Sequence, residues 1–198
     1  DLALYGIAVG IGETDNVDLS PHPTSQTIAA ADLDFDLRRS GSGLDASALG
    51  DFTDLYYLQG VYSNQVLGRF DGLATAKLWS DRLKWTAADD FGEEQVDPFA
   101  PIVPSELQRV NVFTTGPELT LRPSYSTFLN VDARYSQVSY QTSPFDDHNL
   151  SAAAEFGRQI SPLSSLYLMA QAEELRFSDT SVNTDYNRRQ AYGRYQIH

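Results

Sequence analysis

The stretch from Ala29 to Arg38, with the sequence AAADLDFDLR, decides the fold class of this chain. Its odd-numbered positions are all apolar, and four of its five even-numbered positions carry a charge. Successive side chains of a β-strand point to opposite faces of a sheet, whereas the apolar face of a helix repeats every 3.6 residues. The stretch therefore predicts a strand with one wholly apolar face and one charged face.

The same alternation recurs along the whole chain, in stretches of roughly 10–14 residues. A soluble sandwich usually has strands of about 5–6 residues, whereas a strand that crosses a bilayer obliquely needs about 9–11 residues. Strand length therefore favours a sheet that spans a membrane. The alternating stretches are centred on residues 5–12, 29–38, 44–53, 66–78, 83–88, 113–122, 129–136, 150–156, 166–173 and 186–197.

The connectors between these stretches alternate between short and long. Short turns are predicted at residues 39–43, 79–82, 122–124 and 160–162, and longer loops at 14–26, 54–64, 93–108, 142–148 and 177–185. Short periplasmic turns and longer external loops are typical of bacterial outer-membrane barrels. We therefore expect an all-β fold, an antiparallel up-and-down transmembrane β-barrel, as a single outer-membrane domain over residues 1–198. The ten strands either close by themselves or form the N-terminal part of a larger barrel.

Composition excludes several classes of function. The net charge of −13, without a Lys/Arg cluster, argues against nucleic-acid binding. The absence of cysteine excludes disulfides and thiolate metal sites. No window approaches 18 consecutive apolar residues, so no transmembrane helix is expected. The chain starts without Met, so we expect a mature or trimmed form of the protein. It also lacks the C-terminal aromatic residue that many barrel proteins carry, so we expect that the natural protein continues beyond residue 198.

The charged face of the predicted strands is the candidate functional surface. In a barrel this face would line a wet lumen, and opposite charges on neighbouring strands could pair across it. Because the wall is acidic on balance, we expect it to suit a neutral glycan or cations better than a polyanion. The predicted lumen-lining residues are Asp32, Asp34, Asp36, Arg38, Asp45, Arg69, Asp71, Lys77, Glu118, Arg122, Asp132 and Arg134.

The sequence contains no complete catalytic or metal-binding motif. The Asp32–Asp36 run has the spacing of a calcium loop, but Leu37 and Gly43 stand where that loop needs Gly and Glu. Asp89–Asp90 and Glu93–Glu94 could act as glycosidase carboxylates, although a solvated loop explains them more simply. None of the three histidines stands in an arrangement that suggests a triad. We therefore expect no enzyme activity, no metal and no cofactor.

Aromatic side chains near strand ends are candidates for the two girdles that outer-membrane barrels place at the membrane interfaces. The alternative is that they are ordinary strand aromatics of a soluble sheet. The candidates are Tyr5, Phe52, Tyr56, Tyr57, Trp79, Trp85, Tyr125, Tyr135 and Tyr140.

Three segments carry a resemblance: GETDNV at residues 12–17, NVFTTGPELTL at 111–121 and DYNRRQA at 185–191. They resemble the outer-membrane β-barrel proteins associated with exopolysaccharide and PEP-CTERM gene clusters, in which a TDNV turn follows the first strand and DYxR opens a later one. Members of that family are usually about twice as long, so this chain would match their N-terminal half. The resemblance implies an outer-membrane location and a role in exopolysaccharide export, and it supplies no catalytic residues.

Three hypotheses for function remain open at this point. The first is an outer-membrane channel or export component for extracellular polysaccharide, with membrane lipid, the polysaccharide and periplasmic export proteins as partners. The second is a structural or adhesion-type barrel with a plugged lumen. The third is a soluble secreted β-protein that binds carbohydrate through Trp79, Trp85 and the tyrosines.

Overall fold

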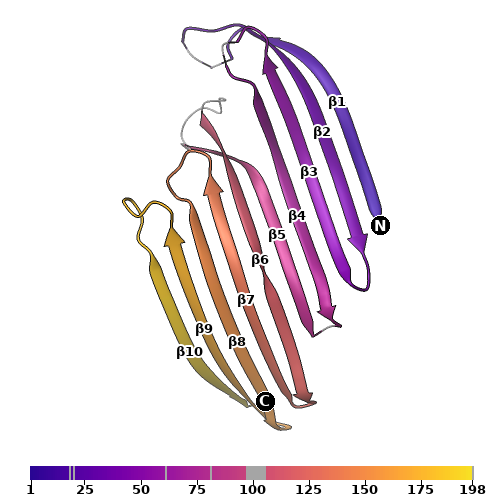
Figure 1. Ribbon diagram of the computed structural model, residues 1–198, viewed down its shortest axis with the longest axis vertical. Coiled ribbons are helices and arrows are strands. Elements are labelled where there is room, and N and C mark those ends of the chain that lie inside the picture. The colour runs from indigo at the N-terminus through magenta and orange to yellow at the C-terminus, as the bar shows by residue number, and fades with distance from the viewer. Residues whose placement is uncertain (18, 20, 61, 81, 97–105, 198) are drawn as a thin grey trace.

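Ten strands form one antiparallel sheet in the computed structural model, which describes residues 1–17, 19, 21–60, 62–80, 82–96 and 106–197. Each strand lies beside its neighbours in sequence, so the sheet order runs from β1 to β10 without a crossover (Figure 1). The described residues contain no α-helix. The prediction of an all-β, up-and-down sheet of ten strands is confirmed. The sheet is open, because β1 and β10 form its two edges and do not pair with each other.

The strands are long, from 12 to 18 residues. Short turns join them at the end that is lower in Figure 1, and longer connectors join them at the upper end. Their bounds are β1 Leu2–Thr14, β2 Gln26–Ser40, β3 Leu44–Tyr57, β4 Gln65–Trp79, β5 Leu83–Gln95, β6 Leu107–Ser124, β7 Thr127–Tyr140, β8 Asp147–Ser161, β9 Ser164–Phe177 and β10 Tyr186–Ile197.

The strands extend further into the upper connectors than the sequence predicts. β3 continues to Tyr57 and β5 to Gln95, so the acidic pairs 89–90 and 93–94 lie within a strand and not in a solvated loop. The alternation of apolar and polar residues fades there, but the backbone hydrogen bonds between strands do not depend on it. Within the longer loop predicted at residues 93–108, residues 97–105 lie outside the described part of the chain.

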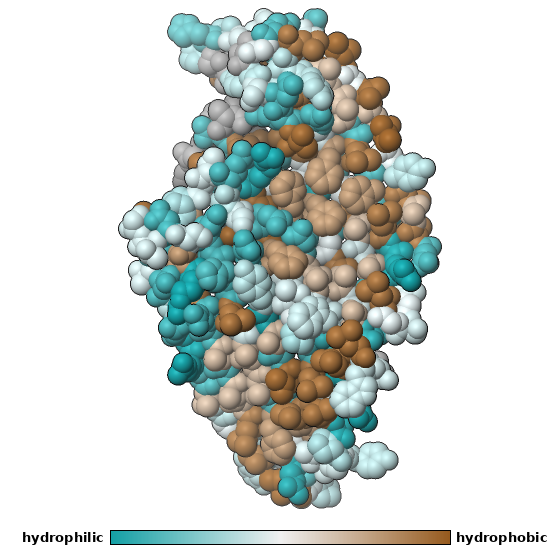
Figure 2. Space-filling model, viewed as in Figure 1, coloured by the Kyte–Doolittle hydropathy of each residue, from teal (hydrophilic) through white to brown (hydrophobic). Residues whose placement is uncertain are grey.

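The register brings the alternating patterns of all ten strands into phase. Directly paired residues point to the same face of a sheet, and the register places Ile7 opposite Leu33, Leu33 opposite Phe52, and Phe52 opposite Gly68. We call this side the apolar face and the other the polar face. In Figure 2, hydrophobic side chains gather over β1–β5 and the lower ends of β6–β10, and hydrophilic ones over the upper parts of β7–β10.

The sheet is a single layer without a hydrophobic core. Among the apolar side chains described, only Tyr57 is buried, with 5% of its surface exposed. Large apolar side chains remain open on the apolar face, for example Val9 at 82% and Leu168 at 48% exposure. A sheet with one apolar face is stable only when that face is covered. In this sheet the apolar face must therefore be covered by something other than the described residues.

Neighbouring strands are displaced steadily along one another, as the stepped strand ends in Figure 1 show. A row of paired residues that starts at Leu2, at the lower end of β1, arrives at Tyr186, at the upper end of β10 and eleven residues before Ile197. With about 3.3 Å per residue along a strand and about 4.8 Å between strands, this slip corresponds to a tilt of about 40°. Strands of closed barrels tilt by about 35–45°.

Candidate functional site on the polar face

All twelve residues predicted to line a lumen lie on the polar face. The register places Asp34 opposite Asp51 and Asp51 opposite Arg69, and farther along the sheet it places Glu118 opposite Asp132. Since the remaining positions follow by alternation from these, one surface carries the whole predicted set. The set extends over β2, β3, β4, β6 and β7 and forms a broad charged wall, not a compact cluster.

Three ion pairs connect members of this set. All are partly exposed, and solvent screens them, so they orient side chains more than they stabilise the sheet. Two of them cross between strands, as the sequence suggested for opposite charges on neighbouring strands. The pairs are Lys77 Nζ with Asp45 Oδ2 at 2.6 Å, Arg134 Nη2 with Glu118 Oε2 at 3.7 Å, and, within β2, Arg38 Nη2 with Asp36 Oδ2 at 2.8 Å.

The part of the polar face on β2–β5 is strongly acidic. Asp34 stands directly opposite Asp51, and Asp71 directly opposite Asp90, although like charges in such positions destabilise a strand pair. None of these four carboxylates has a hydrogen bond or ion pair to another described residue. The described residues hold no group of three or more side chains suited to a metal ion. The Asp32–Asp36 run contributes three carboxylates to this part of the face, of which Asp32 accepts a hydrogen bond from Thr53 Oγ1 at 2.6 Å and Asp36 pairs with Arg38.

Two hollows lie side by side on the polar face of β6–β9. The lower hollow, of about 780 Å³, is formed by the turn at residues 125–126 and the adjoining ends of β6–β9. The upper hollow, of about 580 Å³, is more polar and is lined by Glu118, Asp132 and Arg134 among others. Arg122 lines both, so the two hollows adjoin at this residue. Sequence reasoning identified Arg122 but missed the aromatic side chains that surround it.

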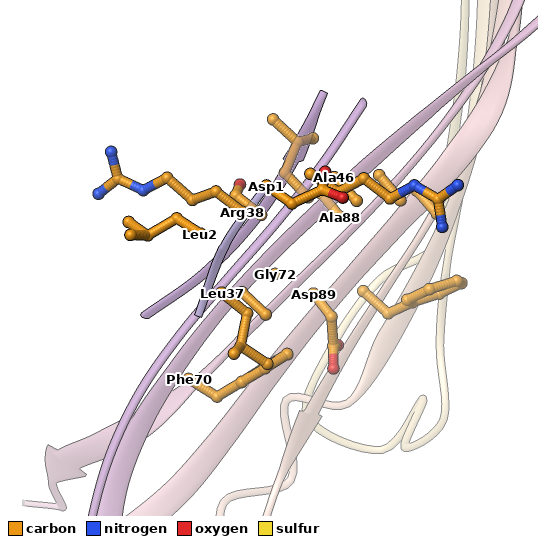
Figure 3. A pocket seen from close by; sticks show the side chains of 16 residues that line it. Asp1, Leu2, Leu37, Arg38, Ala46, Phe70, Gly72, Ala88 and Asp89 are labelled. Atoms are coloured by element: carbon orange, nitrogen blue, oxygen red, sulfur yellow. The ribbon is translucent and has the colours of Figure 1, made fainter. Parts of the chain in front are cut away.

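A groove of about 500 Å³ lies on the apolar face across β2–β6. Small residues such as Ala48 and Gly72 form its floor, and Leu37 and Phe70 form its walls. In Figure 3, Leu37, Phe70 and Asp89 lie on one side of the strands and Arg38 extends away from them. The groove suits an alkyl chain or a packed side chain, and its only hydrogen-bonded carboxylate, Asp89, accepts from Asn111 Nδ2 at 3.0 Å.

The upper ends of three hairpins share a device that the sequence did not reveal. A side chain from the connector accepts a hydrogen bond from the backbone N–H at or near the end of the preceding strand: Asn64 from Tyr57 at 3.3 Å, Asp146 from Tyr140 at 2.6 Å, and Asp185 from Phe177 at 2.9 Å. Asn and Asp in loops commonly satisfy backbone groups in this way. The long connectors are therefore tied to the strands that they join.

Two further contacts order the upper connectors. Buried Gln108 accepts hydrogen bonds from Thr142 Oγ1 at 2.8 Å and Ser143 Oγ at 2.9 Å, which holds the connector after β7 against β6. In the connector after β9, the hydroxyl of Ser181 donates to Asp179 at 2.6 Å. That hydrogen bond holds the pKa of Asp179 below its usual value.

The carboxylates considered for glycosidase chemistry do not form a catalytic pair. Within β5, Asp89 and Glu93 point to the apolar face and Asp90 and Glu94 to the polar face, because neighbours in a strand alternate. Glu93 is held by the backbone N–H of Gly68, which donates to its Oε1 at 2.8 Å. No substrate could contact both members of either adjacent pair.

The aromatic candidates for interfacial girdles divide between the faces. Tyr5 and Tyr135 share the apolar face with the lower pair Trp79 and Trp85, as a girdle requires. Tyr57 and Tyr140, by contrast, point to the polar face, and Phe52 lies mid-strand in a cluster with Phe35, Phe70 and Phe91. The prediction is therefore wrong for Tyr57 and Tyr140, because parity, which sets the face, was not applied to them, and for Phe52, because it lies away from the strand ends.

Comparison with protein-family models, curated proteins and solved structures gives no match for this chain. No helix in the described part of the chain is long and apolar enough to cross a membrane.

Proposed function

We propose that this chain forms all or part of the wall of a bacterial outer-membrane β-barrel and serves as a channel or export component for extracellular polysaccharide. In this arrangement the apolar face contacts lipid and the polar face lines a wet passage. The observation that carries the proposal is the single-layer sheet, with one mainly apolar face and almost no buried apolar side chain among the described residues.

A lipid bilayer is the environment that fits the apolar face best. The apolar stretch covers nine residues in β2, Ala29–Leu37, and seven in β9, Leu166–Ala172. At a tilt of about 40° these stretches span about 23 and 18 Å, somewhat less than the roughly 25 Å expected for the lipid-facing part of an outer-membrane barrel. A soluble protein would need a second layer over this face, and the described residues supply none.

The edges of the sheet fit the same proposal. Hydrocarbon offers no hydrogen-bond partners, so a membrane-spanning sheet must pair every edge. β1 and β10 run in opposite directions and meet the geometric condition for antiparallel pairing, either with each other or with additional strands of a larger barrel. The accumulated slip already corresponds to the strand tilt of closed barrels.

Support for a glycan as the cargo comes from the polar face and from the resemblance to exopolysaccharide-associated barrels. The two adjoining hollows on β6–β9 carry charged, amide and hydroxyl side chains, which can form hydrogen bonds to a hydrated, hydroxyl-rich polymer. Periplasmic export proteins would meet the barrel at its short-turn end. The passage requires no catalytic group, metal or cofactor.

The test is folding in the presence and absence of detergent micelles, followed by conductance in planar bilayers. We expect a β-rich species that requires detergent, that changes gel mobility when boiled and that opens conducting pores. A monodisperse β-protein that folds in plain buffer would overturn the membrane proposal. A detergent-folded species that stays electrically silent would overturn the passage and favour a plugged barrel.

A further inference from the structure

The lower hollow on the polar face differs in charge from the rest of the chain. Although the chain has a net charge of −13, no carboxylate lines this hollow, whereas Arg122 does. Arg158 is also part of the lining, but it lies two residues from Phe156 on β8, so its side chain belongs to the apolar face. Arg122 has no ion pair or hydrogen bond to another described residue. The charges of the polar face are therefore segregated, with unpaired carboxylates on β2–β5 and the unpaired guanidinium group of Arg122 at the lower end of β6.

Two aromatic rings form part of the wall of the hollow. Phe128 on β7 and Tyr167 on β9 lie with ring centroids 6.3 Å apart at an interplanar angle of 54°. Gly157, on the strand between them, makes this arrangement possible, because a Cβ at that position would collide with the ring of Phe128. From β10, the guanidinium group of Arg194 stands 4.7 Å from the centroid of Tyr167. The backbone at Gly157 thus accommodates the ring of Phe128, and the charge of Arg194 helps to hold the ring of Tyr167.

Small hydrogen-bonding side chains complete the lining. Ser124, Ser126 and Ser165 contribute hydroxyl groups and Gln159 an amide, all from the turn and the strand ends around the rings. A ligand that satisfies this lining has an apolar ring face, several hydroxyl groups and a negative charge. A sugar ring that bears a carboxylate has all three, whereas an inorganic anion has only the last.

We propose that the lower hollow is a subsite for an acidic sugar unit of a glycan chain. The sugar ring packs against Phe128 and Tyr167, and its carboxylate accepts hydrogen bonds from the guanidinium group of Arg122. The upper hollow, which Arg122 also lines, offers polar side chains to the next unit of the chain. This inference rests on the proposed function, because it names the substrate class of the same face, and it replaces the neutral glycan expected from the overall charge.

The test is a calorimetric titration of the full chain, folded in detergent micelles, with trigalacturonate and with its neutral, fully methyl-esterified form. We expect trigalacturonate to bind and the ester to bind at least about tenfold more weakly, because the ester lacks the charge that Arg122 pairs. Added salt should weaken the binding of trigalacturonate. Equal binding of the two probes would overturn the acidic subsite, as would competition by inorganic phosphate at the same concentration.

Three variants locate the binding. Arg122→Gln should weaken trigalacturonate by about tenfold while affecting the ester little, and Tyr167→Leu, which keeps an apolar side chain, should weaken both probes. The matched control is Arg189→Gln on β10, which removes the same charge from the apolar face, opposite the hollow. An Arg122→Gln protein that binds as tightly as the wild type would refute the assignment.

The titration does not require an open pore, so the two proposals can fail separately. A conducting barrel that does not bind trigalacturonate would remove the subsite and leave the passage. A silent barrel that binds it would leave the subsite and remove the passage.

Discussion

At the scale of single residues, close approach of the backbones decides what the sheet tolerates. Gly116 lies on β6 beside β7, and a Cβ at this position would run into the backbone carbonyl oxygen of Ala133. The same carbonyl and that of Pro117 accept hydrogen bonds from Arg134 Nη1 at 3.1 and 3.0 Å, so the local backbone is fixed. The sequence presents Gly116 as one of 13 glycines, and its importance depends on a neighbouring strand that sequence alone does not place.

Gly116→Ala should therefore destabilise the folded sheet by about 1–3 kcal/mol, the usual cost of inserting a methyl group where there is no space. The measurement is urea unfolding of the detergent-folded protein, followed by tryptophan fluorescence. The control is Gly92→Ala on β5, where a Cβ meets nothing within 4 Å; this change should be neutral or slightly stabilising. Equal midpoints for the two variants would contradict the packing at β6 and β7.

At the scale of elements, the strands and their faces could be predicted because alternation is a local property of the sequence. The ten strands and the side on which Leu33 or Asp34 lies follow from it, and the register confirms them. Strand ends could not be predicted, because the backbone ladder continues past the apolar stretch into polar residues such as Glu93. Alternation likewise does not encode whether the apolar face contacts lipid or an aqueous environment, since the same pattern of residues serves in both cases.

The substitution Leu168→Arg distinguishes an apolar face in contact with lipid from one in contact with water. Leu168 lies on the apolar face of β9 between Phe156 and Gly193, with 48% of its surface exposed. In a bilayer, arginine at such a site costs about 2–4 kcal/mol near the midplane, whereas at an exposed site in water the effect would stay within about 0.5 kcal/mol. Gln171→Arg, on the polar face of the same strand, is the control and should be tolerated. Unfolding in lipid vesicles measures both, and equal tolerance of the two would speak against lipid contact.

At the scale of the whole molecule, the charges of the wall are distributed in a way that only the register reveals. The sequence correctly groups the twelve charged residues by face, because parity within each strand suffices. It does not show that Asp34 meets Asp51 or that Asp71 meets Asp90, since these oppositions depend on turn geometry and on the slip between strands. Because opposed like charges cost stability, we expect the negative potential of this wall to serve the proposed passage more than the fold.

If this wall lines the passage, Asp34→Lys with Asp71→Lys should lower the preference of the pore for cations over anions, because two unpaired negative charges become positive. The same change converts two like-charge oppositions into opposite-charge ones, so thermal stability should stay level or rise by about 0.2–1 kcal/mol per pair. The measurement is the reversal potential in planar bilayers under a salt gradient. Glu13→Lys with Asp15→Lys, at the upper end of β1 and in the connector after it, changes the net charge equally away from the wall and should leave the reversal potential nearly unchanged. A conducting double variant with wild-type selectivity would show that the polar face of β2–β5 does not border the ion path.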